Sequence, residues 1–353
     1  MDTIISKKRS VVIIIMVLIG STSFAKQSIQ NDELEYERFK YLIKVKQEVS
    51  KKFWPDFSKK ILFGPMMYYS MNGVYVINPN EKLNKKISYK KLAQNRNLPL
   101  IGKVSDKIDS TALYMYVSRR EKDSTKLDYK NTIAFFSDVS LTNKFIPDVK
   151  ETNEWLSMVI HETFHQYQRK IKKFRKNQIT SKKDFDRDTL AYFYKNIKWF
   201  RNSIKQENEL LLNSLKENEI ESIEKMINTY LSLKKNRISR VKEEFKTNIT
   251  DIESSLERSE GTARYIEYKT KEYLKDVEHI PALTQLDQFY HPENLPEYTL
   301  EKDEWMYTIK GLYVYTIGFN LTRLLEKLKI EYQKTIFNHN RSFDDYLINF
   351  MKK

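Results

Sequence analysis

Residues 158–167 read Met-Val-Ile-His-Glu-Thr-Phe-His-Gln-Tyr, and we expect the chain to be organised around this stretch. It contains the pattern His-Glu-x-x-His. Residues four apart share one face of a helix, so the imidazoles of His161 and His165 can converge on one point. The carboxylate of Glu162 can then reach a water molecule held at that point. This arrangement binds zinc through two histidines and supplies a general base for hydrolysis.

The residues around the motif have the pattern of a buried helix. No glycine or proline interrupts the range from Glu151 to Tyr167, and we expect the helix to extend to about Phe174. Uncharged side chains recur at the spacing of one helix face, which predicts that this face is buried and that the motif lines another face. They are Leu156, Val159, Ile160, Thr163 and Phe164.

The N-terminus has the composition of a secretory signal peptide. Lys7, Lys8 and Arg9 precede the apolar run at residues 11–20, and small residues mark a cleavage site after Ala25. The apolar run is shorter than the roughly 20 residues that a transmembrane helix needs. We therefore predict that residues 1–25 are a signal peptide and that the mature protein is secreted or periplasmic.

The composition limits the kind of site that the chain can hold. It has 353 residues, no cysteine and a formal net charge of +15. Without cysteine there are no disulfides and no thiolate ligands, so zinc must be held by histidine and carboxylate. The positive charge permits contact with an anionic cell surface, although lysines spread along the whole chain are typical of solvated faces. There is no nucleic-acid motif, no glycine-rich phosphate loop and no indication of oligomeric state.

The pattern of the chain predicts an α+β fold in two parts. Residues 26–150 should form an N-terminal α/β part, with a helix at residues 31–52 followed by a small mixed sheet. Asn72-Gly73 between two apolar runs is typical of a hairpin. The strands are expected at residues 61–63, 66–70, 73–77, 111–118 and 132–137.

Residues 151–353 should be predominantly helical. A loop is expected at residues 282–296, which contain several prolines. A long helical insertion is expected at about residues 180–250. The amphipathic segments are residues 185–215, 220–233, 238–256 and 305–329.

A hydrolytic zinc site usually has three protein ligands and one open position. Ile171 stands where a Met-turn enzyme would have its third histidine, so that class is disfavoured. The remaining histidines are His279, His291 and His339. We favour a carboxylate within residues 259–267, although the glutamates there also fit the charged face of an amphipathic helix.

Two motifs resemble those of the glutamate-zincin metallopeptidases, the thermolysin-like group. Residues 161–168 read His-Glu-x-x-His-x-x-Gln, and residues 260–265 read Glu-Gly-x-Ala-x-Tyr, as in a bacterial branch of that group. The resemblance covers about twenty residues. It implies a zincin-like fold, Zn²⁺ as cofactor, Glu260 as the third metal ligand and Glu162 as the general base. Gly261 and Ala263 would let the Glu260 helix approach the zinc helix, since glycine inside a helix otherwise costs about 1 kcal/mol.

The sequence departs from the group in two respects. His165 and Glu260 are separated by 94 residues, which requires the helical insertion to return the chain to the metal. Arg264 occupies the position at which a thermolysin-type aspartate would orient a histidine, so the groups that orient the histidines are left open. Glu257, one turn before Glu260, is the second choice for the third ligand.

Peptide hydrolysis also needs a donor to the tetrahedral oxyanion. Tyr313, Tyr315 and His291 are candidates, and residues 315–318 resemble a Tyr-x-x-Gly motif of related families. We therefore favour Tyr315, although a packing role suits any of the 23 tyrosines. One strand of the N-terminal sheet is expected to line the cleft and to pair with an extended peptide.

These features predict an exported zinc metallopeptidase that acts on a peptide or protein substrate. One alternative is a zinc amidase that acts on cell-wall peptide, which would suit the basic charge. Another is a helical binding protein without catalytic activity. Glu162 argues against the binding protein, because a purely structural zinc site has no use for a base beside a ligand.

Overall fold

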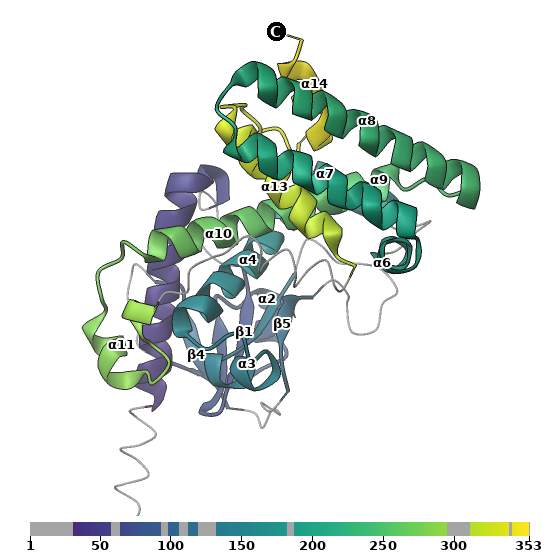
Figure 1. Cartoon of the computed structure of the whole chain (residues 1–353). Helices are drawn as coiled ribbons and strands as arrows, with labels where there is room; N and C mark the ends of the chain where they lie inside the picture. Colours follow the sequence, from purple (N-terminus) through teal and green to yellow (C-terminus); the bar gives the residue numbers. More distant parts are fainter. Residues whose placement is uncertain are drawn as a thin grey trace, which may run out of the picture.

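The computed structural model describes residues 31–57, 64–92, 98–105, 112–118, 132–181, 187–294, 311–338 and 341–352. The predicted signal peptide, the predicted strand at residues 61–63 and His339 lie outside these ranges. The described part has an α+β fold, with one mixed sheet and a majority of helix (Figure 1). None of the described helices has both the length and the apolar composition needed to cross a membrane.

The sheet has six strands in the order β3-β4-β2-β1-β6-β5. Strands β1 and β6 are parallel and the other neighbours are antiparallel, so the sheet is mixed as expected. The predicted β1–β2 hairpin is confirmed: Ser70 pairs with Gly73, whose φ of 134° suits only glycine. The strands are β1 (Met66–Ser70), β2 (Gly73–Ile77), β3 (Tyr89–Lys91), β4 (Ile101–Val104), β5 (Met115–Val117) and β6 (Ala134–Ser137).

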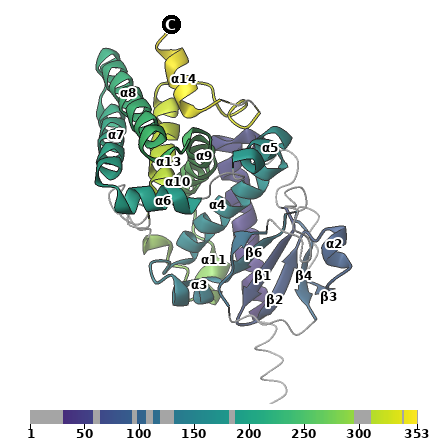
Figure 2. The ribbon, with the colours of Figure 1, turned by 90° about the vertical axis from the view of Figure 1, so that its right-hand side faces the viewer.

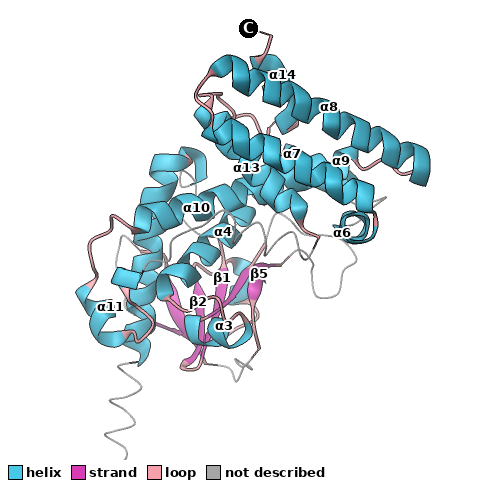
Figure 3. Cartoon of the chain, viewed as in Figure 1, coloured by secondary structure: helices cyan, strands magenta, loops and turns pink. Residues whose placement is uncertain are grey.

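Side chains on β1 alternate between two hydrophobic clusters, as the two-residue period of a strand requires. Tyr68 belongs to the main core, where its ring lies 4.7 Å from Phe39 of the N-terminal helix (residues 31–53) and 5.9 Å from Trp155. Met67 and Tyr69 lie on the other face, in a smaller cluster with Leu83 of the short helix α2 (Glu81–Asn84). The N-terminal helix and the helix that carries Trp155 therefore pack on one face of the sheet (Figure 3).

The helical part lies beyond this face, and α7 and α8 project from it as a pair (Figure 2). Its helices are α3 (Val139–Phe145), α4 (Thr152–Lys170), α5 (Lys172–Ser181), α6 (Arg187–Asn196), α7 (Lys198–Lys216), α8 (Ile220–Phe245), α9 (Thr250–Leu256), the π-helix η2 (Glu257–Gly261), α10 (Thr262–Leu274), α11 (Pro281–Leu286), α13 (Tyr313–Lys327) and α14 (Phe343–Phe350). Short segments are α2 (Glu81–Asn84) and the 3₁₀ turns η1 (Pro55–Phe57) and η3 (Pro292–Asn294).

Several predicted helix boundaries are wrong. The helix of the motif ends at Lys170, and the segment predicted at residues 185–215 is divided between α6 and α7. Both breaks fall at isoleucines with extended backbone, Ile171 and Ile197, whose branched side chains favour that conformation. Conversely, α8 runs unbroken to Phe245, and Lys246 then ends it with a left-handed φ of 54°.

The loop expected at residues 282–296 and the extent of the sheet also need correction. The loop region contains α11, which Pro281 begins at the first helical position, where proline is favoured. Strands β3 and β4 and helix α14 were not predicted. Between the motif helix and Glu260 the described chain forms helices α5 to α9, and the insertion at about residues 180–250 stays a prediction.

Candidate metal centre

The centre begins with α4, which holds both histidines of the motif inside the protein. Trp155 anchors the first turns of this helix to the sheet, since its indole N–H donates to the Ser137 carbonyl at 2.8 Å. Val159, Ile160 and Phe164 are buried on the apolar face, as the periodicity predicts. His161 and His165 are buried on the adjoining face, with 7% and 4% of their surface exposed.

Glu260 lies opposite these histidines on η2. Its Oε2 atom is 3.1 Å from Nε2 of His165 and 4.0 Å from Nε2 of His161. One ligand atom from each of the three residues lies within 4.8 Å of the others. The structure therefore brings together the three residues that were predicted as metal ligands, although 94 residues separate His165 from Glu260.

The π-helix meets α13 through two glycines. A Cβ atom at Gly261 would lie 2.2 Å from the carbonyl carbon of Gly318, and one at Gly318 would lie 2.3 Å from the backbone carbonyl oxygen of Glu257. The two backbones are thus in direct contact. Gly261 was expected to allow close approach to the zinc helix, but it serves contact with α13 instead. The π-turn places Glu260 towards α4, and such turns are frequent at functional sites.

Gln168 holds the second nitrogen of His165. Nδ1 of His165 lies 2.9 Å from Oε1 of Gln168, one turn further along α4. The amide of Gln168 donates to the Ser259 carbonyl at 2.8 Å and to the Thr262 hydroxyl at 2.9 Å. This chain of contacts fixes His165 relative to the segment that carries Glu260.

Glu267 faces the second nitrogen of His161. Its Oε2 atom lies 3.2 Å from Nδ1 of His161, and the same carboxylate pairs with Arg264 and Lys271. Burial lowers the pKa of His161, but the carboxylates of Glu267, Glu162 and Glu260 together outweigh this effect and the pKa is raised. Burial raises the pKa of Glu267, but Arg264 and Lys271 hold it well below its usual range.

The sequence offered one signal for Glu267 that was not used. It follows Glu260 by seven residues, which is two helical turns, so both carboxylates face α4. Arg264 replaces the expected aspartate and holds the glutamate that meets His161. Gln168 belonged to the quoted motif, yet the sequence alone gave it no partner.

Glu257 is not part of the cluster. Both of its carboxylate oxygens accept from the Lys234 ammonium of α8, at 3.0 and 2.9 Å. Burial raises the pKa of Glu257 to about 8, although Lys234 opposes this. The second choice for the third ligand therefore has a structural partner, and Glu260 is the carboxylate that lies with the two histidines.

The other predicted residues have different surroundings. Glu162 follows His161 on α4 and is half-buried. Tyr315 is buried on α13, one turn before Gly318, and its role as oxyanion donor stays a prediction. Tyr313 is excluded from that role because its hydroxyl donates to the buried Glu253. His279 and His291 are exposed near α11 and do not join the cluster.

The donor set fits a divalent metal ion. Metal–ligand bonds of about 2.0–2.1 Å at tetrahedral angles separate ligand atoms by roughly 3.3 Å. The 3.1 Å between Glu260 and His165 is close to this value, and the 4.0 Å between Glu260 and His161 is longer. Two imidazoles and one carboxylate suit zinc and other first-row divalent ions alike. No family model, no curated protein and no solved structure matches this chain.

Proposed function

We propose that this protein is an exported zinc-dependent metallopeptidase of zincin-like fold. The observation that carries the proposal is the buried group of His161, His165 and Glu260, with Glu162 next to the first histidine. A zinc ion bound there would polarise the scissile carbonyl and lower the pKa of a bound water towards about 7. The cell-surface context rests on the composition of residues 1–25 and on the basic charge.

Glu162 is the proposed general base. It lies on the helix of the ligands, it is only half-buried, and it can therefore exchange protons with water in the site. In the proposed reaction its carboxylate accepts a proton from the attacking water and delivers it to the leaving amine. Tyr315 is the proposed donor to the oxyanion.

We propose that β5 binds the substrate as an extended strand. It is an edge strand of the sheet, and it is the strand in closest contact with α4. The Arg169 guanidinium of α4 donates to the Val117 carbonyl at 3.3 Å, which fixes β5 beside the helix of the ligands. The backbone of an edge strand can pair with a peptide through main-chain hydrogen bonds.

Metal stoichiometry is the first test. Elemental analysis of the purified chain after incubation with zinc should give one ion per chain. We expect this ion to be lost in His161→Ala and bound more weakly in Glu260→Gln. Glu257→Gln tests the second choice of ligand, and Glu272→Gln, a half-buried carboxylate on the following helix α10 that pairs with Lys269, is a matched control. Wild-type protein that binds no zinc would contradict the proposal.

Activity is the second test, and it separates the base from the ligands. Glu162→Gln should retain zinc and lose roughly 10²–10⁴-fold in kcat/KM, because only the proton transfer is removed. The substrates should be a panel of unstructured proteins, short peptides and cell-wall peptides. Cleavage of none of them by the zinc-loaded wild type, or full activity in Glu162→Gln, would refute the peptidase assignment.

A further inference from the structure

His161 lies between two carboxylates that come from one continuous helical segment. Nε2 faces Glu260 at 4.0 Å, and Nδ1 faces Glu267 at 3.2 Å. The pairing of Glu260 with His165 and of Glu267 with His161 requires α10 to run antiparallel to α4. The two nitrogens of His161 are thus assigned to different partners by the packing of these helices.

Glu267 is itself held by two cations. Its Oε2 atom is shared between Arg264 and His161, and its Oε1 atom lies 3.3 Å from Lys271. Both Glu267 and Arg264 are at least 95% buried. Separating the two side chains would therefore leave buried charges without this ion pair, which costs free energy. Arg264 and Lys271 come from the turns before and after Glu267, which leaves its carboxylate little freedom to rotate.

We propose that Glu267 is the positioning residue of His161. The carboxylate accepts a hydrogen bond from Nδ1–H of His161 and thereby keeps Nε2 as the unprotonated nitrogen that faces Glu260. Arg264 and Lys271 hold the carboxylate in place. This inference rests on the proposed function, because it concerns the same metal centre. Glu267 would then orient His161, the role that a thermolysin-type aspartate would have at the position of Arg264.

The two histidines therefore face acceptors of different charge. Nδ1 of His165 makes a hydrogen bond with Gln168, a neutral amide, whereas Nδ1 of His161 faces Glu267, a carboxylate, at 3.2 Å. A charged acceptor makes the stronger hydrogen bond and makes the imidazole a stronger donor to a metal. Loss of Glu267 should consequently cost more metal affinity than loss of the Gln168 contact.

The first experiment measures zinc affinity by competition with a chromophoric chelator. We expect Glu267→Gln and Glu267→Ala to weaken binding about 10–100-fold, the range observed when a carboxylate behind a metal-bound histidine is removed. Glu272→Gln removes the same charge from a half-buried position of α10, where it pairs with Lys269, and should bind zinc as the wild type does. The absorption spectrum of the Co²⁺-loaded protein should change in the Glu267 variants and stay unchanged in Glu272→Gln.

The second experiment reads the tautomer of His161 in metal-free protein. Nitrogen-15 NMR of the imidazoles should show the proton of wild-type His161 on Nδ1, with the signal assigned from its loss in His161→Gln. Glu267→Ala should move this proton to Nε2, whereas Glu272→Gln should not. Circular dichroism of each variant shows whether it is folded.

The outcomes separate this inference from the proposed function. Wild-type protein without zinc would refute the metal centre, yet the tautomer of His161 would still report whether Glu267 positions it. Zinc bound with equal affinity by the wild type and both Glu267 variants, and an unchanged tautomer in Glu267→Ala, would overturn the positioning role. A Glu267→Asp variant that recovers part of the lost affinity would support that role over a purely structural ion pair.

Discussion

Asp138 caps α3 from a buried position, and its charge lowers the free energy of unfolding at neutral pH. Its carboxylate accepts from the Leu141 N–H at 2.7 Å, while only 3% of the residue is exposed. Burial raises the pKa of Asp138 to about 6, and the nearby Glu35 contributes in the same direction. The folded protein therefore binds a proton at this residue more tightly than the unfolded chain does.

The sign of the stability change follows from this raised pKa. The contribution of Asp138 to the free energy of unfolding is largest below about pH 4, the pKa of an aspartate in the unfolded chain. It is lost as the pH rises through about 6, the pKa in the folded protein. Asparagine keeps the cap without the charge, so Asp138→Asn should raise the free energy of unfolding at pH 7 by about 1–2 kcal/mol. Urea unfolding at pH 4 should show little difference. A variant less stable than the wild type at pH 7 would contradict this account.

At the scale of secondary-structure elements, the contact between η2 and α13 tolerates no side chain. Gly318→Ala should destabilise the protein by about 1–3 kcal/mol, because its Cβ would meet the Glu257 carbonyl oxygen and a backbone must move. Elsewhere in a helix, alanine would be about 1 kcal/mol more favourable than glycine. Zinc affinity should fall too, since η2 carries Glu260. Unfolding and chelator competition would measure both effects, and a stabilised variant would show that the contact is loose.

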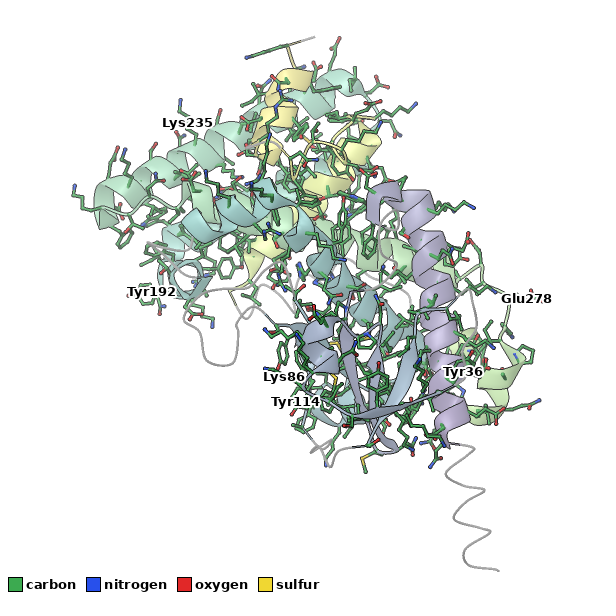
Figure 4. All side chains as sticks on the ribbon, turned by 180° about the vertical axis from the view of Figure 1, so that it is seen from behind. Tyr36, Lys86, Tyr114, Tyr192, Lys235 and Glu278 are labelled. Atoms are coloured by element: carbon green, nitrogen blue, oxygen red, sulfur yellow. The ribbon has the colours of Figure 1, made fainter. Side chains whose placement is uncertain are left out.

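The insertion is tied to the same π-helix by a buried ion pair. Lys234 of α8 binds Glu257 of η2, and its ammonium also lies 3.0 Å from the Asp344 carboxylate of α14. Its neighbour Lys235, labelled in Figure 4, lies on the exposed surface of α8. One residue along the helix thus separates a structural lysine from a solvated one.

The same substitution at the buried Lys234 and at the exposed Lys235 tests the ion pair. Lys234→Met should cost about 3–5 kcal/mol of unfolding free energy, because Glu257 and Asp344 lose the ammonium that they share and the buried Glu257 must take up a proton. Lys235→Met should stay within about 0.5 kcal/mol of the wild type, as exposed substitutions do. Adding Glu257→Gln to Lys234→Met should recover part of the loss, since the unpaired carboxylate is then removed. Equal losses in the two single lysine variants would refute the coupling of α8 to η2.

The sequence predicted the elements whose formation depends on neighbouring residues, such as α4 and the β1–β2 hairpin. The periodicity around His161 identified α4, and the run of turn residues identified the β1–β2 hairpin. The break at Lys246 was missed because a lysine supplies the left-handed residue where glycine is the usual signal. The contacts of Gly261 with Gly318 and of His161 with Glu267 depend on how distant helices pack. Sequence spacing placed these residues on faces of helices but did not identify the facing helix.

At the scale of the whole molecule, one carboxylate joins three distant segments. Asp287, just after α11, accepts from the Arg38 guanidinium of the N-terminal helix at 2.7 and 2.5 Å. It also accepts from the Thr152 hydroxyl at the start of α4, at 2.8 Å. The chain after α10 thus returns to fasten the N-terminal helix beside the helix of the ligands (Figure 1).

Asp287 should give a pH dependence opposite to that of Asp138. Burial would raise the pKa of Asp287, but its bonds with Arg38 outweigh burial and lower it. Its contribution is therefore present above about pH 4 and lost as the pH falls through the lower folded value. Asp287→Asn should cost about 3 kcal/mol at pH 7, because the buried Arg38 loses its closest carboxylate partner and keeps only Glu35, at 3.4 Å.

The difference between Asp287→Asn and the wild type should narrow as the pH falls below about 4, where the wild-type carboxylate also loses its charge. Glu81→Gln breaks an exposed pair with Lys85 and should change the unfolding free energy by less than about 0.5 kcal/mol at every pH. Urea unfolding of the three proteins from pH 3 to pH 7 would measure these curves. A constant difference across that range would show that Asp287 acts through its hydrogen bonds and not through its charge. No difference at any pH would show that the Arg38–Asp287 pair does not stabilise the protein.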